Sequence, residues 1–441
     1  QEHKDDILNF IHGRKQHYFS GATKYFIALV DNVPFAFILG DIMKADENLS
    51  ALQKEAMSKF GNTISVDFGI GNPAYIGKGL ASQTLEKFIL YYQESIDPKA
   101  DTFFIDPDEN NPRAKHVYEK AGFNHIGEYE PTEGAFIGHT NLSMIKKVSL
   151  GRYLDEELAK KLIATQFPEY ADLTVTEVEQ QGHDNRTYRI GNDMLIRMPT
   201  AESYALKVPK EQELLPKLAK HLSIAIPAPI KMCKPSADYP YPFSIYKWLP
   251  GKSINLLTLT DQEKEQLAVD LAKFLKELQA IIDVEGPEPG QHNWWRGDHV
   301  SVYDKGAREQ IAELAEIIDA SKALALWDRA SATKWNKTPI WIHGDFAIGN
   351  MLMDGGKLSA VIDFGGAAVG DPACDLVIAW TYLSGKARDI FVAEMGLDDD
   401  TWLRARAWAL WKATFELCNI ADQNSPEALL QKRIIDEVIN E

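Results

Sequence analysis

The first third of the chain alternates short apolar runs with segments in which apolar residues recur at helical spacing. Period-two alternation predicts strands, and apolar residues three or four positions apart predict helices. The predicted strands are Tyr25–Val30, Pro34–Leu39, Thr63–Ile70, Thr102–Ile105 and Phe136–Val148. The predicted helices run from about Gly79 to Tyr92 and over Pro112–Ala121, with one earlier short segment at Asp5–Lys15. This alternation indicates an α/β domain.

The pattern changes around Ser149–Tyr153, where we place a domain boundary. The elements predicted next are a helix at Asp155–Gln166, strands at Leu173–Gln180, Arg186–Ile190 and Met194–Met198, a helix at Lys207–Lys220 and a strand at Phe243–Trp248. Later helices are predicted at Asp261–Ile282, Arg308–Ala325 and Trp402–Ile420, with one hairpin formed by Met351–Met353 and Leu358–Ile362. We therefore expect an α/β domain at 1–148 and an α+β domain at 149–441, with a strand-rich small lobe (149–250) and a helical large lobe (251–441).

Composition and charge narrow the possible partners. The formal net charge of −17 argues against binding nucleic acid or an anionic membrane through a basic face. An acidic surface suits cationic small molecules, or serves solubility. Three widely spaced cysteines predict neither a disulfide framework nor a zinc site and favour a reducing cytoplasm. No signal-peptide pattern opens the chain, and the missing initiator Met suggests a trimmed start.

The strongest chemical signal is a loop and the hairpin that follows it, which together contain His343, Asp345, Asn350 and Asp363. Phosphoryl transfer needs a carboxylate at the attacking hydroxyl and oxygen ligands that hold Mg²⁺ against the nucleotide phosphates. We predict Asp345 as that catalytic carboxylate, with Asn350 and Asp363 as metal ligands, because the hairpin folds the chain back. His343 is predicted to brace the loop. Any single Asp could be a turn residue, but the joint spacing favours function.

These residues lie in segments that resemble the aminoglycoside phosphotransferase family over roughly residues 150–441. The segments are Ile342–Asn350, Val361–Gly365 and Gly370–Leu376. The resemblance implies a eukaryotic-kinase-like fold, a nucleoside triphosphate donor with Mg²⁺, and transfer to a hydroxyl of an aminoglycoside or similar molecule. It gives Asp345 the role of base and Asn350 and Asp363 the role of metal ligands. Asp375 is expected to cap the next helix, whereas Asp371 is either structural or functional.

Nucleotide contacts are predicted in the small lobe. Arg197 stands where kinase-like folds usually place Lys, which keeps the charge but changes the geometry. Its predicted carboxylate partner is Glu211, with Glu213 as the alternative, and Trp248 opens the hinge where the nucleobase docks. In the large lobe, the aromatic cluster Trp294–Asp298 either lines the acceptor pocket or packs as an inter-helix corner.

In the first domain, a glycine-containing loop joins a strand to a helix, where main-chain N–H groups can bind a pyrophosphate. Together with Asp106–Ala114 and Tyr118–Phe123, it resembles the GNAT acetyltransferase superfamily, most closely its aminoglycoside 6′-N-acetyltransferases, over roughly residues 20–148. The residues assigned by resemblance are Gly77, Lys78 and Gly79 to the CoA pyrophosphate, Asn111 to CoA, and Tyr118 to protonating the leaving thiolate. Asp67 would face the substrate amine and accept its proton.

The sequence thus predicts a bifunctional enzyme, with a GNAT fold followed by a two-lobed kinase-like fold. It would phosphorylate with Mg²⁺ and ATP or GTP, and acetylate with acetyl-CoA, substrates of the aminoglycoside class, giving antibiotic resistance. The alternative is a metabolic small-molecule kinase with a degenerate, non-catalytic acetyltransferase-like binding module. The acceptor, the choice between ATP and GTP, the activity of the first domain and the oligomeric state depend on pocket shapes and surfaces that these motifs leave open.

Overall fold

The computed structural model describes residues 24–44, 49–131, 137–150 and 154–441. The predicted segment Asp5–Lys15 and the start of the strand predicted at Phe136 lie outside these residues. The chain divides into two compact units. Unit 1 comprises Gln1–Tyr188, Arg197–Ala205 and Cys233–Phe243, and unit 2 comprises Arg189–Ile196, Leu206–Met232 and Ser244–Glu441.

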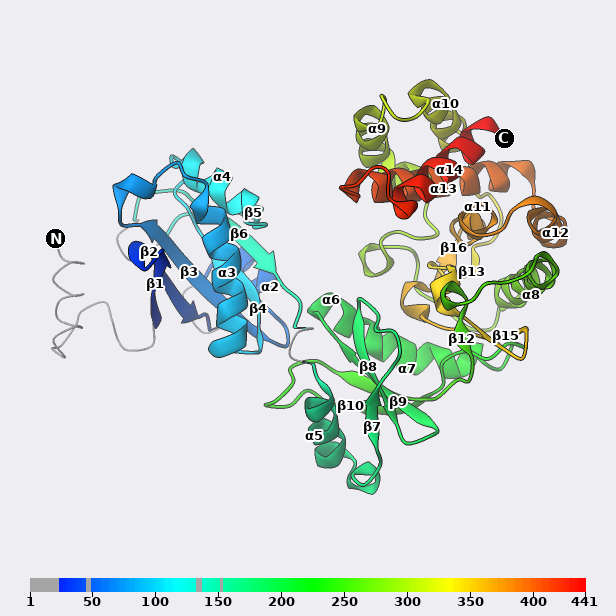
Figure 1. Cartoon of the computed structure of the whole chain (residues 1–441), viewed down its shortest axis with the longest axis horizontal. Helices are drawn as coiled ribbons and strands as arrows, with labels where there is room; N and C mark the ends of the chain where they lie inside the picture. The colour runs from blue at the N-terminus through cyan, green and yellow to red at the C-terminus, as the bar shows by residue number, and fades with distance from the viewer. Residues whose placement is uncertain (1–23, 45–48, 132–136, 151–153) are drawn as a thin grey trace. The chain divides into compact units, whose positions relative to one another are not determined.

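Unit 1 contains a six-stranded sheet of order β1-β2-β3-β4-β6-β5. Its strands are β1 (Lys24–Val30), β2 (Val33–Ile42), β3 (Asn62–Ile70), β4 (Ala100–Ile105), β5 (Asn124–Tyr129) and β6 (Asn141–Lys147). Its helices are α2 (Ala51–Ala56), α3 (Leu80–Ser95) and α4 (Pro112–Lys120). Helix α3 lies along one face of the sheet (Figure 1). Its side chains Leu85, Phe88, Ile89 and Tyr92 are buried against strand residues such as Val66. This is the α/β layout that the sequence predicts.

Strands β3 and β4 form the one parallel pair among the described pairings of this sheet, and they separate before β3 ends. The last paired residues are Ser65 and Phe104, whereas β3 continues to Ile70. Because side chains alternate across a strand, Ser65 and Asp67 face away from the α3 core that buries Val66. The separated strand ends therefore leave Asp67 at an opening in the sheet.

A second sheet has the order β10-β11-β9-β8-β7, and its strands are divided between the two units. These strands are β7 (Val175–Glu177), β8 (Asn185–Ile190), β9 (Met194–Pro199), β10 (Pro229–Cys233) and β11 (Phe243–Lys247). Within unit 1, α5 (Glu156–Gln166) precedes β7, and residues on both sides of position 149 share polar contacts. The Tyr241 hydroxyl donates to Asp101 at 2.6 Å, and Lys147 pairs with Glu202 at 2.6 Å. The boundary at 148/149 stays a prediction.

Unit 2 is mainly helical around one continuous apolar core. Its longer helices are α7 (Lys207–Leu218), α8 (Asp261–Gln279), α9 (Asp304–Glu313), α10 (Ala320–Ser331), α12 (Gly385–Met395), α13 (Asp399–Asn419) and α14 (Pro426–Asn440). The predicted hairpin is present as β14 (Met351–Asp354) and β15 (Lys357–Val361), and β12 (Lys252–Ser253) pairs with β14. Gly355 and Gly356 both have positive φ, which a two-residue hairpin turn of this kind requires.

The helix predicted at Arg308–Ala325 is wrong as a single element, because α9 and α10 replace it. Helix α9 ends before Leu314, and Asp319 caps the start of α10 by accepting from the Lys322 N–H. Apolar residues continue across the break at helical spacing, so periodicity alone did not detect it. In the described part of the chain, no helix combines the length and the apolarity that crossing a membrane requires.

Candidate functional site

Asp345 and Asn350 are in direct contact in unit 2, as the hairpin prediction requires. The Asn350 side-chain N–H₂ donates to both the carbonyl and the Oδ2 of Asp345, each at 3.0 Å. Asn350 ends a short 3₁₀ turn, η6 (Ile348–Asn350), and its carbonyl accepts from the Ile362 N–H at 2.8 Å, one residue before Asp363. The hairpin thereby joins the two ends of the predicted cluster of Asp345, Asn350 and Asp363, which we call the phosphotransfer cluster.

The loop that carries Asp345 is held by the buried carboxylate of Asp375, which was predicted to cap the next helix. Asp375 accepts from the N–H groups of His343 at 2.6 Å and Gly344 at 2.8 Å, instead of capping the following helix. Burial raises the pKa of Asp375, and the bonds from the loop oppose that shift. His343 braces the loop as predicted, since its Nδ1 accepts from the Asp345 N–H and its Nε2 bonds the Ile362 carbonyl at 3.0 Å.

Gly344 lets this loop approach the turn after Asp363. Its φ is +81°, and a Cβ there would meet the Gly366 carbonyl oxygen at 2.2 Å. Asp363 itself is left-handed, with φ of 66° and ψ of 66°, a conformation that is uncommon for residues other than glycine and concentrates at functional sites.

Lys210, which the sequence analysis did not single out, fixes the turn from helix α7. Its ammonium donates to the carbonyls of Gly365 at 2.7 Å and Ala367 at 3.2 Å. Burial lowers the pKa of Lys210 to about 8, and neighbouring Lys207 adds to this, whereas Glu211 and Asp363 oppose it. The contact joins elements about 155 residues apart, so no local sequence signal could reveal it.

Asn350 and Asp363 fit a magnesium ion in the donors they offer. The Asn350 N–H₂ is committed to Asp345, which leaves its amide oxygen as the possible ligand, beside the Asp363 carboxylate. Mg²⁺ prefers oxygen ligands, and it is commonly held by one or two protein groups together with substrate phosphates. Among the described residues, no group of three His, Cys, Asp or Glu could hold a metal.

The predicted nucleotide residues have distinct surroundings. Glu211 is buried and accepts from the Tyr246 hydroxyl, whereas the alternative Glu213 is exposed and pairs with Lys217, so Glu211 is the inward carboxylate. The main-chain N–H of Trp248 donates to the Asp193 carbonyl at 2.7 Å, so this donor is already used within the protein. Arg197 lies half-buried on β9 in unit 1. The nucleotide roles of Arg197, Glu211 and Trp248 stay predictions.

The aromatic segment Trp294–Asp298 combines features of both predicted roles, the lining of an acceptor pocket and a packed inter-helix corner. Trp294 and Trp295 have positive φ, are 45% and 36% exposed, and the Lys207 ammonium lies 4.4 Å from the Trp294 ring. Arg296 instead packs over Trp411 of α13 at 5.2 Å. The first two rings are thus open to a ligand, while the rest of the segment is packed.

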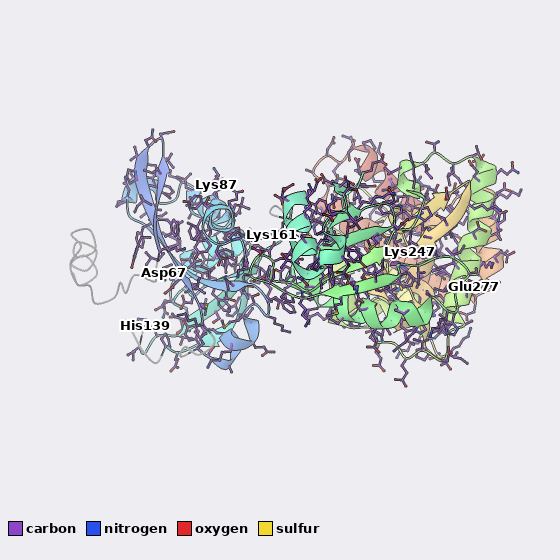
Figure 2. The ribbon with its side chains drawn as sticks, turned by 90° about the horizontal axis from the view of Figure 1, so that it is seen from below. Asp67, Lys87, His139, Lys161, Lys247 and Glu277 are labelled. Carbon is purple, nitrogen blue, oxygen red and sulfur yellow. The ribbon has the colours of Figure 1, made fainter. Side chains whose placement is uncertain are left out.

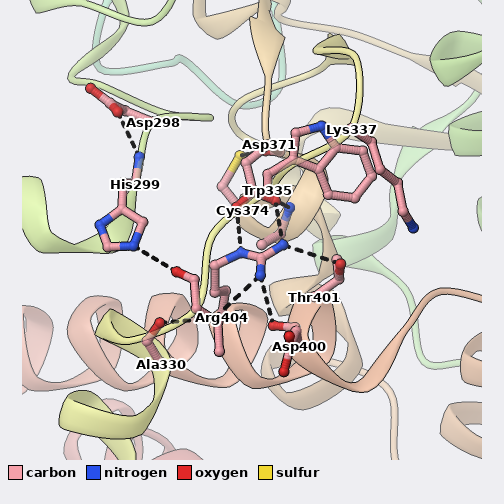
Figure 3. A network of polar contacts seen from close by, with 12 residues as sticks. Asp298, His299, Ala330, Trp335, Lys337, Asp371, Cys374, Asp400, Thr401 and Arg404 are labelled. Atoms are coloured by element: carbon pink, nitrogen blue, oxygen red, sulfur yellow. Dashed lines mark hydrogen bonds and ion pairs between the residues drawn. The ribbon is translucent and has the colours of Figure 1, made fainter.

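Asp371 is structural in this arrangement (Figure 3). It caps the 3₁₀ segment η8 (Pro372–Val377) by accepting from the Ala373 N–H and forms a buried ion pair with Arg404 of α13 at 2.6 Å. The remaining Arg404 donors contact Thr333 Oγ1, the Asp400 carbonyl and Thr401 Oγ1. The Asp371 N–H donates to the Gly297 carbonyl at 2.7 Å. This network ties α13 and the aromatic segment to the chain just after the phosphotransfer cluster.

Replacing Arg404 by Ala is expected to destabilise unit 2 by about 3–5 kcal/mol, because Asp371 would be left buried without its partner. All ten tryptophans lie at position 248 or later, so tryptophan fluorescence during denaturation reports this unit. Arg308→Ala is the control, since Arg308 forms surface ion pairs and its loss should cost about 0–1 kcal/mol. Equal effects of the two variants would contradict the role given to Asp371.

Unit 1 contains an acidic pocket of about 310 Å³ on the sheet face opposite α3. Its lining residues include Asp41, Ser65, Asp67, Phe104, Asp106 and Tyr129. Asp67, labelled in Figure 2, lines the pocket from the separated end of β3, and Asp106 follows directly after β4. Asp106 accepts from the Tyr129 hydroxyl and from Asn141 at 3.2 Å, and burial raises its pKa. Asp41 and Asp106 were not predicted as pocket residues. The signals available were the alternation of side chains along β2 for Asp41 and the position directly after β4 for Asp106.

Tyr118 of α4 is buried, and burial together with the charges of Asp67 and Asp106 raises its pKa. The raised pKa keeps the Tyr118 phenol protonated at neutral pH. Gly77 and Gly79 have φ of +77° and +73°, and Gly79 precedes the first residue of α3, as the pyrophosphate loop prediction requires. The Asn111 side chain caps α4 by accepting from the Ala114 N–H at 3.1 Å, so its contact with CoA, like that of Lys78, stays a prediction.

We expect Tyr118→Phe to slow acetyl transfer by about 10²–10⁴-fold, because the leaving thiolate would lose its proton donor. Acetyl-CoA binding, measured by calorimetry, should persist, since the ring and the glycine loop remain. Tyr91→Phe is the matched control, because Tyr91 is 48% exposed on α3. A folded wild-type chain that fails to bind acetyl-CoA would refute the acetyltransferase interpretation.

Comparison with known protein families matches both parts of the chain. Residues 174–409 match a family described as the phosphotransferase enzyme family, and residues 11–130 match one described as the acetyltransferase (GNAT) domain. An aminoglycoside 3′-phosphotransferase from Escherichia coli is 25% identical over 223 residues, which cover 47% of this chain and 76% of that protein. These matches bear out the predicted order of a GNAT fold and a kinase-like fold.

Solved structures give a similar picture for the second part. The GDP complex of an aminoglycoside 2′-phosphotransferase-IIIa mutant matches with a TM-score of 0.50 and 23% identity, covering 65% of this chain and 95% of that one. This likeness concerns the fold. The match to an aminoglycoside N(6′)-acetyltransferase from Legionella pneumophila covers 34% of this chain and 74% of that one, at 23% identity and a TM-score of 0.26.

Proposed function

The chain belongs to the phosphotransferase enzyme family and also carries a GNAT domain, and from this premise we propose that it phosphorylates a hydroxyl group of an aminoglycoside. The observation that carries the proposal is the phosphotransfer cluster, in which Asn350 orients the Asp345 carboxylate and the hairpin brings Asp363 to the same loop. The similarity to an aminoglycoside 3′-phosphotransferase supports this class of acceptor, and the net charge of −17 suits a polycation.

In the proposed reaction, the Asp345 carboxylate accepts the proton of the attacking hydroxyl and orients its oxygen. Asn350 and Asp363 would hold a Mg²⁺ ion, which when bound neutralises charge on the donor phosphates. Lys210 keeps the Asp363 turn in its left-handed conformation by binding two carbonyls of that turn. His343 and Asp375 hold the loop so that the carboxylate needs little rearrangement at the moment of transfer.

We further propose that the GNAT domain acetylates an amine of the same substrate class, using acetyl-CoA. The acidic pocket supports an amine as the substrate, because its lining residues Asp67 and Asp106 could hold an ammonium group. Asp67 would accept a proton as the amine attacks, and Tyr118 would protonate the leaving thiolate. The absence of nucleic-acid and membrane partners, and the cytoplasmic location, remain expectations from composition.

A panel of aminoglycosides, incubated with the full chain, Mg²⁺ and either ATP or GTP, tests the phosphotransferase proposal by mass spectrometry. The expected product carries one added phosphoryl group. Small sugars and amino alcohols serve as competing acceptors in the same assay. Phosphorylation of these and of no aminoglycoside would favour the metabolic kinase instead. A parallel incubation with acetyl-CoA tests for an added acetyl group.

A further inference from the structure

The catalytic loop from His343 to Asn350 contains neither lysine nor arginine. Phosphoryl transfer spreads negative charge over the oxygens of the moving group, and cations aimed at that charge are a main source of catalysis. Two lysines of α7 lie at the Asp363 turn rather than at the loop: Lys210 binds two carbonyls of the turn, and Lys207, whose ammonium lies over Trp294, lies against Gly365. The loop itself therefore supplies no cation to Asp345.

Lys412 of helix α13 lies beside Asp345. Its Nζ lies 3.7 Å from Oδ1 of Asp345, while Asn350 binds the other oxygen, Oδ2, at 3.0 Å. The two carboxylate oxygens of Asp345 thus face different groups: Oδ1 faces the ammonium of Lys412, and Oδ2 faces Asn350, a metal-ligand candidate. Glu416, one helical turn after Lys412, could have formed an intrahelical pair. Among the described ion pairs, however, the ammonium of Lys412 pairs with Asp345.

The backbone of α13 is fixed on the N-terminal side of Lys412. Two turns earlier, Arg404 is locked in the buried network with Asp371. Trp411, the preceding residue, is buried and stacks on Tyr303 with ring centroids 4.1 Å apart. Lys412 itself is 29% exposed, so its ammonium can meet a ligand while its stem packs along the helix. The position beside Asp345 is therefore built into the fold.

We propose that Lys412 is a further catalytic residue, whose ammonium contacts the phosphoryl group as it passes to the acceptor. This inference rests on the proposed phosphotransferase function. The acceptor oxygen forms a bond to the γ-phosphorus while the bond from that phosphorus to the bridging oxygen breaks. The electron pair leaves with the nucleoside diphosphate, and the hydroxyl proton passes to the Asp345 carboxylate. Lys412 keeps its proton throughout and supplies positive charge to the transferring oxygens.

A different role makes the opposite prediction. If Lys412 merely filled the space that an ammonium group of a cationic acceptor takes, its removal would lower the acceptor KM and leave or raise kcat. If Lys412 stabilises the transferred group, its removal lowers kcat. Hydrolysis of the nucleotide should then fall in parallel, because water attacks the same phosphoryl group and no acceptor amine takes part. The sign of the effect on kcat therefore separates the two roles.

The test compares Lys412→Met and Lys412→Arg with the wild-type chain. We expect Lys412→Met to lower kcat for transfer and for nucleotide hydrolysis by about 10²–10³-fold. The Kd of the Mg²⁺-nucleotide, measured by calorimetry, should be unchanged, and Lys412→Arg should recover part of the rate. Lys386→Met is the matched control, because Lys386 is 73% exposed and pairs with Glu265 on the surface.

Undiminished kcat in Lys412→Met, or a change confined to the acceptor KM, would overturn the role of Lys412 and leave the proposed function standing. Loss of rate together with loss of nucleotide binding would also overturn it, since the residue would then act in the ground state. A wild-type chain that phosphorylates no acceptor and hydrolyses no nucleotide would overturn the proposed function, and this inference with it.

Discussion

Asp345→Asn is expected to lower phosphoryl transfer by about 10²–10⁴-fold, the range that removal of a general base produces. The variant keeps the shape of the side chain but cannot accept the proton of the attacking hydroxyl. Binding of the Mg²⁺-nucleotide should be retained, because the metal-ligand candidates are Asn350 and Asp363. Acetyl transfer should also be retained, because the acidic pocket and Tyr118 lie in unit 1.

The control for this variant is Asp354→Asn, in the hairpin that follows the catalytic loop. Asp354 is exposed at the end of β14, next to the two-glycine turn. Its substitution should change neither transfer nor nucleotide binding. Near-normal phosphorylation by Asp345→Asn, measured alongside Asp354→Asn, would contradict the assignment of the base.

Asp363→Asn is expected to abolish measurable transfer and also to weaken Mg²⁺-dependent nucleotide binding, which distinguishes it from Asp345→Asn. The Asp363 carboxylate is the charged member of the proposed ligand pair, and Asn keeps an oxygen without that charge. Asn also tolerates the left-handed conformation of this position, whereas Asp363→Ala adds about 1–2 kcal/mol of backbone strain. Comparison of the two variants separates the loss of a ligand from distortion of the turn.

Calorimetry with nucleotide, in the presence and absence of Mg²⁺, measures this effect. The wild-type chain should bind more tightly with the metal, and Asp363→Asn should lose most of that difference. Thermal unfolding should show Asp363→Asn close to wild type and Asp363→Ala lower. An unchanged metal dependence in a folded Asp363→Asn chain would remove Asp363 from the metal site.

The sequence predicted the core of the candidate site because its chemistry is local. Asp345, Asn350 and Asp363 lie within one loop and one hairpin, so their spacing in the chain reflects their proximity in space. Lys210 and Lys412 could not be predicted in the same way. Each reaches the cluster from a helix distant in sequence, and a lysine on a helix usually faces solvent.

The roles of Asp371 and Asp375 show a different limit of prediction from the sequence. Asp375 was expected to cap a helix, but Asp371 caps the 3₁₀ segment, and Asp375 accepts from N–H groups of the loop that carries Asp345. The signal was present in the sequence, because Pro372 at the first helical position identifies the preceding Asp371 as the capping residue.

Predicted elements were most accurate where apolar periodicity was strong. The predicted helix at Lys207–Lys220 is close to α7 (Lys207–Leu218), and the strand at Thr63–Ile70 to β3. Strand β5 was missed because Asn124–Tyr129 contains mostly polar residues. Its place is set by pairing with β6, a tertiary contact that local propensity does not encode.

We propose that one chain transfers phosphoryl groups at Asp345 and acetyl groups at a separate site. The most direct test incubates one aminoglycoside with Mg²⁺-nucleotide and acetyl-CoA together, using wild-type, Asp345→Asn and Tyr118→Phe chains. Mass spectrometry of the products should show both groups added by the wild type, only acetyl by Asp345→Asn, and mainly phosphoryl by Tyr118→Phe. A phosphorylated product from Asp345→Asn in wild-type yield, or an unmodified aminoglycoside with the wild type, would contradict the account.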